Sequence, residues 1–115
     1  MDCCAYEKGI NVENKSNYTQ EDVEQVCAIF RVLAESSRMK IVLALMERDL
    51  CVCHLAEVCG GTQSAISHQL RVLRDNKVVK AKRKGQSIEY SIADTHVKNI
   101  VQMALAHLGC AGVEV

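Results

Sequence analysis

The sequence predicts a mainly α-helical domain with one β-hairpin. Apolar residues recur every three or four positions in several long stretches, which is the period of one helix face. The chain has no proline and few glycines, so it lacks the frequent breaks of an all-β protein. Apolar and polar residues alternate between positions 78 and 92, as they do in a hairpin. A chain of 115 residues fits one domain with a single small core.

The first predicted helix begins after Thr19, because Thr19 and Asp22 have the spacing of a capping box. Its apolar positions follow at helical spacing and are Val23, Val26, Cys27, Phe30 and Leu33. Ser36 or Ser37 is expected to cap a second helix. The apolar stripe of that helix is Met39, Ile41, Val42, Leu45 and Met46. Residues 1–18 are polar and without periodicity, so we expect a mobile arm there.

Two short helices follow, separated by a pair of glycines. The stretch LCVCHLAEVCGG after Asp49 predicts a short helix that ends at Gly60-Gly61. Thr62 is positioned to cap the next helix. The residues of that helix expected to face inward are Ile66, Leu70 and Leu73.

A hairpin and a last helix complete the predicted domain. Residues 78–83 and 87–92 are expected to pair around Lys84-Gly85. The core-facing positions of the hairpin are Val79, Ala81, Ile88, Tyr90 and Ile92. Asp94 is expected to cap the last helix, whose apolar side is Val97, Ile100, Val101, Ala104, Leu105 and Leu108. The domain is therefore expected to cover residues 19–110, with a short tail at 111–115.

Opposite charges are separated along the chain, although the formal net charge is zero. Residues 1–61 carry a net charge of −4, residues 62–92 a net charge of +5, and residues 93–115 a net charge of −1. A neutral chain argues against nucleic acid as a partner, but a basic segment of this length restores that possibility. The alternative is that these basic side chains only cover a solvated face.

Two short helices joined by a glycine turn and followed by a basic hairpin have the outline of a winged helix-turn-helix. In that fold the second helix enters the major groove of DNA, and the hairpin contacts the flanking backbone. The second helix presents side chains suited to base edges and phosphates, namely Gln63, Ser64, Ser67, His68 and Arg71. The hairpin tip carries Lys82, Arg83 and Lys84, whose phosphate contacts would make binding salt-dependent. We therefore predict double-stranded DNA as a partner.

Four candidate metal ligands lie at the two ends of the last predicted helix: Asp94, His96, His107 and Cys110. His96 and His107 fall on nearly the same face, but their spacing corresponds to about 16 Å along a helix. The ligands of one zinc ion lie only a few Å apart, so one straight helix cannot bring both ends to one ion. Two antiparallel copies can, which predicts a homodimer through the terminal helices with two bridging sites. The alternative is a capping Asp and three incidental surface residues.

The seven cysteines form the second group of candidate ligands. Seven cannot all pair within one chain, and without an export signal they indicate a reducing, cytoplasmic compartment. Cys51 and Cys53 stand at the start of the short helix, and only an irregular helix end brings such positions together. Cys3 and Cys4 of the arm would complete a thiolate-rich site for soft ions, with His54 as a further donor. The alternative is a pair of buried thiols, and two other cysteines are expected in the core: Cys27 and Cys59.

The stretch LCVCHLAEVCGGTQSAISHQLRVLRD, the basic hairpin and DTHVKNIVQMALAHLGC together resemble the ArsR/SmtB family of metal-responsive repressors. The resemblance covers about residues 19–110. It implies a homodimer that represses an operator and releases the DNA when metal binds. The thiolate box is most similar to the branch that senses cadmium, lead and zinc, so Cd(II), Pb(II) or Zn(II) is the expected inducer. The implied ligands are Cys51 and Cys53 with the arm cysteines at one site, and Asp94, His96 and His107 at the other.

Three positions depart from the family pattern. Cys110 stands where many members have His or Glu, Ala56 where one arsenite-sensing branch has a third Cys, and Lys77 where a turn glycine is common. An arsenite-responsive repressor, a thiol redox-switched repressor and a constitutive architectural DNA binder remain alternatives. An enzyme with a small-molecule substrate is not expected, because no Gly-rich phosphate loop or oriented Cys–His–acid set is visible. No apolar run is long enough for a membrane helix.

Overall fold

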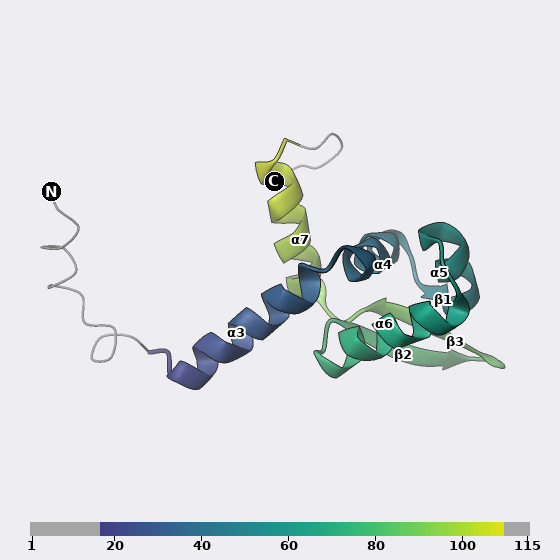
Figure 1. Ribbon diagram of the computed structural model, residues 1–115, viewed down its shortest axis with the longest axis horizontal. Coiled ribbons are helices and arrows are strands. Elements are labelled where there is room, and N and C mark those ends of the chain that lie inside the picture. Colours follow the sequence, from purple (N-terminus) through teal and green to yellow (C-terminus); the bar gives the residue numbers. More distant parts are fainter. Residues whose placement is uncertain (1–16, 110–115) are drawn as a thin grey trace, which may run out of the picture.

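Three helices, α4, α5 and α6, pack together beside a small antiparallel sheet, and α3 and α7 extend from this body (Figure 1). The computed structural model describes residues 17–109. In chain order the elements are α3 (Gln20–Leu33), α4 (Ser36–Glu47), β1 (Leu50–Cys51), α5 (Val52–Cys59), α6 (Gln63–Asp75), β2 (Val79–Lys84), β3 (Ser87–Ile92) and α7 (Thr95–His107). The predicted mainly helical fold with one hairpin is confirmed.

Side chains predicted as caps begin three of the helices. At α3, Thr19 Oγ1 accepts from the Asp22 backbone N–H at 3.0 Å, and the Thr19 N–H donates to Asp22 Oδ2 at 2.9 Å. Thr62 and Asp94 accept in the same way from first-turn N–H groups of α6 and α7, at 3.0 and 3.2 Å. Each cap satisfies a backbone donor that the first turn of a helix leaves without a partner.

The cap of α4 is Glu35, so the prediction of Ser36 or Ser37 was wrong. Glu35 has an extended backbone, and its Oε1 accepts from the N–H groups of Ser37 at 2.9 Å and Arg38 at 3.3 Å. Ser36 and Ser37 are already helical. A longer carboxylate therefore folds back to fill the position that a serine hydroxyl more often fills.

The sheet contains a short strand that the sequence did not predict. Its strand order is β1-β3-β2, and in β1 Leu50 pairs with Tyr90 and Cys51 with Glu89. The expected short helix therefore begins at Val52 rather than at the start of the LCVC stretch. A two-residue strand depends on its distant partner β3, so the local sequence carries little signal for it.

The hairpin turn lies one residue later than predicted. Because Lys84 pairs with Ser87, the loop is Gly85-Gln86, with Gly85 at φ 64°. Ile88 was expected to face the core, but its side chain is 42% exposed. It pairs with Arg83 beyond the end of β1, so the distal hairpin extends past the packed part of the sheet.

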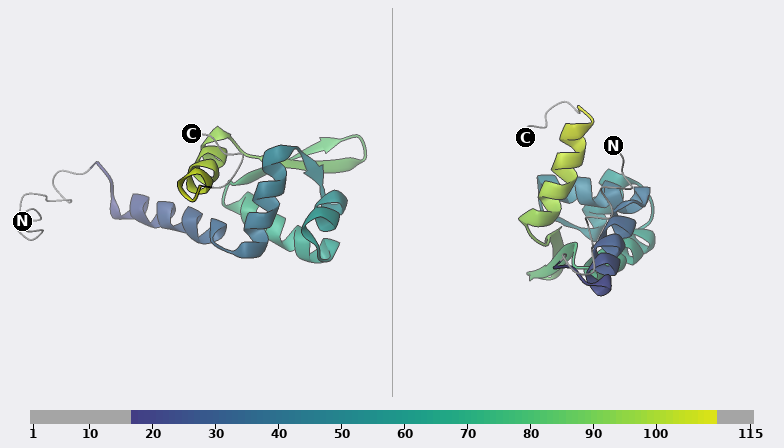
Figure 2. Two further views of the ribbon diagram at one scale, coloured as in Figure 1. Left: turned by 90° about the horizontal axis from the view of Figure 1, so that it is seen from above. Right: turned by 90° about the vertical axis from the view of Figure 1, so that its left-hand side faces the viewer.

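The core lies between the sheet and α4, α5 and α6. Its fully or nearly fully buried side chains include those of Ile41, Val42, Leu45, Leu55, Ile66, Leu70, Leu73, Val78 and Val79. The inward face predicted for α6 is confirmed by Ile66, Leu70 and Leu73. Cys59 is half-buried and packs against this core, as expected. Cys27 was also expected in the core but is exposed, because α3 projects away from the body (Figure 2).

Lys77 occupies the left-handed region, with φ 63°, at the turn from α6 to β2. The Lys77 N–H donates to the Arg74 carbonyl at 3.0 Å, and the Val78 N–H donates to the Leu73 carbonyl at 2.9 Å. This pair of hydrogen bonds is the Schellman ending of a helix, which favours glycine at the Lys77 position. At the position where the family commonly has a turn glycine, Lys77 therefore holds a backbone conformation that only glycine adopts without strain. No helix within residues 17–109 is long and apolar enough to cross a membrane.

Candidate metal centres and nucleic-acid interface

The outer face of α6 carries every side chain predicted to contact DNA from that helix. All five are exposed: Gln63, Ser64, Ser67, His68 and Arg71. The helix follows α5 across a turn in which Gly60 and Gly61 have φ of 83° and 104°. Only glycine adopts such angles without strain, so this pair sets the angle between the two helices. The pair α5 and α6 has the order and exposure of a helix-turn-helix.

The hairpin of β2 and β3 lies beside α6 and extends its basic surface. Lys82, Arg83 and Lys84 are exposed near the tip, and Lys84 Nζ lies 3.6 Å from Glu89 Oε1. Between α6 and β3 there is a polar hollow of about 580 Å³, lined by Ser67, Leu70, Arg71, Arg74, Asp75 and Tyr90. Exposed basic side chains thus lie on α6, in the hollow beside it and near the hairpin tip, and such side chains suit a phosphate backbone.

The first candidate metal centre lies where β1 ends and α5 begins. Cys51 is the N-cap residue of α5 and has an extended backbone, so it lies at the helix end just before the regular helical backbone begins. Cys51 Sγ lies 3.2 Å from His54 Nδ1. Cys53 is exposed, and its Sγ accepts a hydrogen bond from Gln63 Nε2 at 3.6 Å. The contact from Gln63 carried no sequence signal, because it crosses the turn between two helices.

The second candidate centre is divided between the two ends of α7. At the start of the helix, His96 Nδ1 lies 3.5 Å from Asp94 Oδ2. The backbone N–H of Val97 and the neighbouring His96 hold the pKa of Asp94 below its usual value, so Asp94 stays an anionic donor. His107 is exposed in the last turn of the same helix. The structure therefore groups Asp94 with His96 and leaves His107 apart, as the helix geometry requires.

Neither centre is complete within residues 17–109, where no three candidate ligands gather around one point. Cys3, Cys4 and Cys110 lie outside the described residues. The donors present fit soft and borderline cations, because thiolate and imidazole are the preferred ligands of zinc and its heavier relatives. To hold a metal ion, each candidate centre would need further donors in addition to those within residues 17–109 of one chain.

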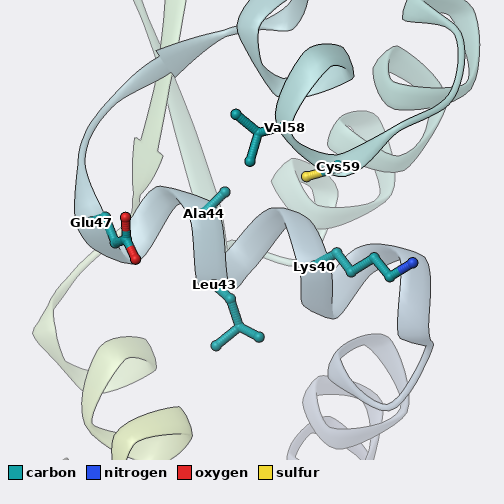
Figure 3. A pocket seen from close by; sticks show the side chains of 6 residues that line it. All are labelled: Lys40, Leu43, Ala44, Glu47, Val58 and Cys59. Atoms are coloured by element: carbon teal, nitrogen blue, oxygen red, sulfur yellow. The ribbon is translucent and has the colours of Figure 1, made fainter. Parts of the chain in front are cut away.

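Cys59 belongs to neither centre. It lines an open hollow of about 400 Å³ between α4 and α5, together with Lys40, Leu43, Ala44, Glu47 and Val58 (Figure 3). Burial raises the pKa of the Cys59 thiol, and the charge of Lys40 opposes this effect. A half-buried thiol with a raised pKa is typical of a cysteine that serves in packing.

Solved structures share this arrangement of helices and hairpin. The chain is similar to a homodimeric winged helix-turn-helix DNA-binding domain from Mycobacterium bovis, with a TM-score of 0.74 and 22% identity, over 82% of this chain and 90% of that one. It is also similar to the solution structure of apo-NmtR, with a TM-score of 0.71 and 37% identity, over 93% of this chain and 89% of that one. The fold and the exposed basic surface define a winged helix-turn-helix DNA-binding regulator.

The family model for the arsR family of bacterial regulatory proteins matches residues 35–81. The chain is 41% identical to a transcriptional repressor SmtB homolog from Synechocystis sp., over 76% of this chain and 67% of that protein. It is 33% identical to a cadmium resistance transcriptional regulatory protein CadC homolog from Staphylococcus aureus, over 83% of this chain and 84% of that protein. It is 46% identical to the transcriptional regulator NmtR from Mycobacterium tuberculosis, over 72% of this chain and 69% of that protein.

The chain belongs to the arsR family of bacterial regulatory proteins. It is a metal-responsive transcriptional repressor that binds DNA, and it is not an enzyme. The resemblance recognised in the sequence is thereby confirmed, and metal sensing is favoured over the thiol redox alternative.

Proposed function

We propose that the chain acts as a homodimer that holds an operator in the metal-free state and releases it when Cd(II), Zn(II) or Pb(II) binds. The observation that carries this proposal is the split set of ligands on α7. Asp94 and His96 lie together at one end and His107 lies at the other, so a second chain must supply the missing donors. The site of action is then the cytoplasm, where bacterial DNA lies.

The surface available for this dimer is the outer face of α3 and α7. Its large apolar side chains are exposed, namely Val23, Val26, Phe30, Ile100, Met103 and Leu108. An apolar hollow of about 320 Å³ lies between the two helices, lined by Phe30, Leu33, Ile100, Ala104 and Leu108 among others. Exposed apolar patches of this kind mark interfaces, and α7 helices packed antiparallel across it would bring Asp94 and His96 to the partner's His107.

The thiolate centre is proposed to use Cys51, Cys53 and the arm cysteines Cys3 and Cys4. Cys51 and Cys53 stand at the N-terminus of α5, where backbone N–H groups and the helix dipole favour anionic ligands. His54 lies close enough to Cys51 to join the same coordination shell. Thiolates select soft ions, which favours Cd(II) and Pb(II) at this centre, while the α7 centre with its carboxylate and imidazoles suits Zn(II).

DNA release is proposed to follow from dimer geometry. A dimer reads two half-sites about 34 Å apart, so both α6 helices must reach successive major grooves at once. Ligands that bridge chains favour one relative placement of the two helices, and release requires that this placement fit the operator poorly. Reciprocity then requires that operator DNA weaken metal binding by the same factor.

The test counts metal ions per chain by native mass spectrometry under reductant, and measures operator affinity with and without Cd(II) or Zn(II). We expect two ions per chain in the wild type and one in each of two variants, Cys51→Ser/Cys53→Ser and His96→Ala/His107→Ala. A monomeric chain, or an operator affinity that Cd(II) and Zn(II) leave unchanged, would contradict the proposal. Arsenite in the same titration tests whether the thiolate centre also accepts a three-coordinate ion.

A further inference from the structure

One side chain belongs to both of the surfaces described above. Gln63 is the first residue of α6 and one of the residues predicted to contact DNA, and its Nε2 donates to Cys53 Sγ at 3.6 Å. Both side chains are exposed, so no packing contact fixes Gln63 in this position. The amide therefore has two available partners, the sulfur on α5 and an operator on the outer side of α6.

These two partners compete for the same amide. Glutamine reads a base edge with its amide oxygen and nitrogen together, which requires the amide plane to face the groove. An amide whose Nε2 points back to Cys53 cannot take that orientation. The hydrogen bond to an uncharged thiol is weak, since sulfur in a thiol is a poor acceptor, so DNA readily replaces it. A metal-bound thiolate is an anionic acceptor, and hydrogen bonds to ionised groups are about twice as strong as neutral ones.

We propose that Gln63 is a positioning residue that couples the thiolate centre to DNA reading within one chain: metal on Cys53 retains the Gln63 amide at the sulfur and withdraws it from the operator. The coupling needs no movement of α5 against α6. It acts in addition to the change of dimer geometry and rests on the proposed metal site at Cys53. By reciprocity, an operator that holds the Gln63 amide leaves the metal-bound sulfur without a donor and so weakens metal binding.

The test compares Gln63→Leu with Ser64→Ala, a change in the same first turn of α6. Operator dissociation constants are measured for the metal-free and the Cd(II)-loaded dimer at one salt concentration, and their ratio is the coupling factor. Gln63→Leu removes the amide at similar size, and we expect it to lower the coupling factor by roughly tenfold, the usual effect of one hydrogen bond to a charged group. Ser64→Ala is expected to weaken both states equally and to leave the factor unchanged.

A second readout does not depend on DNA. In ¹⁵N spectra of the wild type, Cd(II) is expected to shift the side-chain amide signals of Gln63 and to leave those of Gln69 in place. A coupling factor in Gln63→Leu equal to that of the wild type, or Gln63 amide signals that ignore Cd(II), would overturn the proposed coupling while the repressor function stands. If the wild type shows no ultraviolet thiolate–Cd(II) absorption, both the proposed thiolate centre at Cys53 and the coupling that rests on it would be overturned.

Discussion

Arg38 Nη1 donates to Gln69 Oε1 at 3.1 Å, and this hydrogen bond joins the first turn of α4 to the middle of α6. The same guanidinium donates through Nε to the Val32 carbonyl at 2.9 Å. Arg38 is half-buried and therefore links three elements: the end of α3, the start of α4 and the helix predicted to read DNA. α3 contributes to the proposed dimer surface, so Arg38 connects a helix of that surface to the helix predicted to contact DNA.

We expect Arg38→Met to lower the free energy of unfolding by about 1–3 kcal/mol, because it leaves the Val32 carbonyl and the Gln69 amide without their donor. Urea unfolding of Arg38→Met, Gln69→Leu and the double variant forms a double-mutant cycle. A coupling energy of about 1 kcal/mol between the two positions is expected for residues in direct contact. Effects that simply add would show that the Arg38–Gln69 hydrogen bond contributes nothing to stability.

Lys77→Gly is expected to stabilise the fold by about 0.5–1 kcal/mol. A non-glycine residue in the left-handed region costs roughly 1–2 kcal/mol, and the greater freedom of glycine in the unfolded chain offsets part of the gain. Lys77→Ala removes the same charge but keeps the Cβ atom, so it should bring no such gain. Thermal unfolding of the two variants side by side separates backbone strain from charge, and equal melting temperatures would argue against strain.

The sequence was most informative where the signal is local. Thr19, Thr62 and Asp94 cap helices as predicted, because a cap depends on residues three positions apart. The strand β1 was missed because its two residues pair with β3, about 40 positions later in the chain. Cys27 was placed in the core because an apolar stripe does not tell whether it packs within the chain or against a partner.

In the candidate site, too, local features could be predicted from the sequence and contacts between elements could not. The exposure of the α6 residues predicted to contact DNA followed from the helical period, and the proposed need for a second chain followed from the length of α7. The hydrogen bond between Gln63 and Cys53 did not follow from any pattern. It depends on the angle at which Gly60 and Gly61 let α5 meet α6, which a linear sequence does not contain.

The hairpin tip is expected to contribute affinity rather than sequence preference. Lys82→Ala should weaken binding to operator and to unrelated DNA by the same factor, because a phosphate contact is blind to sequence. The slope of log affinity against log salt should become shallower by about 0.9 for each phosphate that the variant no longer neutralises. Lys84→Ala is the comparison, since Lys84 already pairs with Glu89, and we expect a smaller change in slope. Weaker binding confined to the operator would contradict a phosphate-contacting role.

Glu35 is expected to make the free energy of unfolding depend on pH in the acidic range. Its hydrogen bonds from the Ser37 hydroxyl and from the Arg38 backbone hold the pKa of Glu35 below its usual value. A carboxyl group with a lower pKa in the folded state stabilises the fold above its unfolded pKa, and this contribution is lost as pH falls through the folded value. Denaturant unfolding of Glu35→Gln should therefore show lower stability than the wild type near neutrality. The free energies of unfolding of the two proteins should become equal in acid. A difference in stability that stays constant with pH would show that the lowered pKa of Glu35 is not its cause.

Alkylation should separate the packing thiol from the proposed ligands. Burial raises the pKa of Cys59, so less of its reactive thiolate is present, and we expect Cys59 to react with iodoacetamide more slowly than the exposed Cys27. Site-resolved mass spectrometry gives both rates, and in denaturant they should become equal because burial is lost. Cd(II) should then protect Cys51 and Cys53 while the rates at Cys27 and Cys59 stay unchanged. Protection of Cys59 by Cd(II) would indicate that the metal binds at the hollow between α4 and α5 and would contradict a thiolate centre at the start of α5.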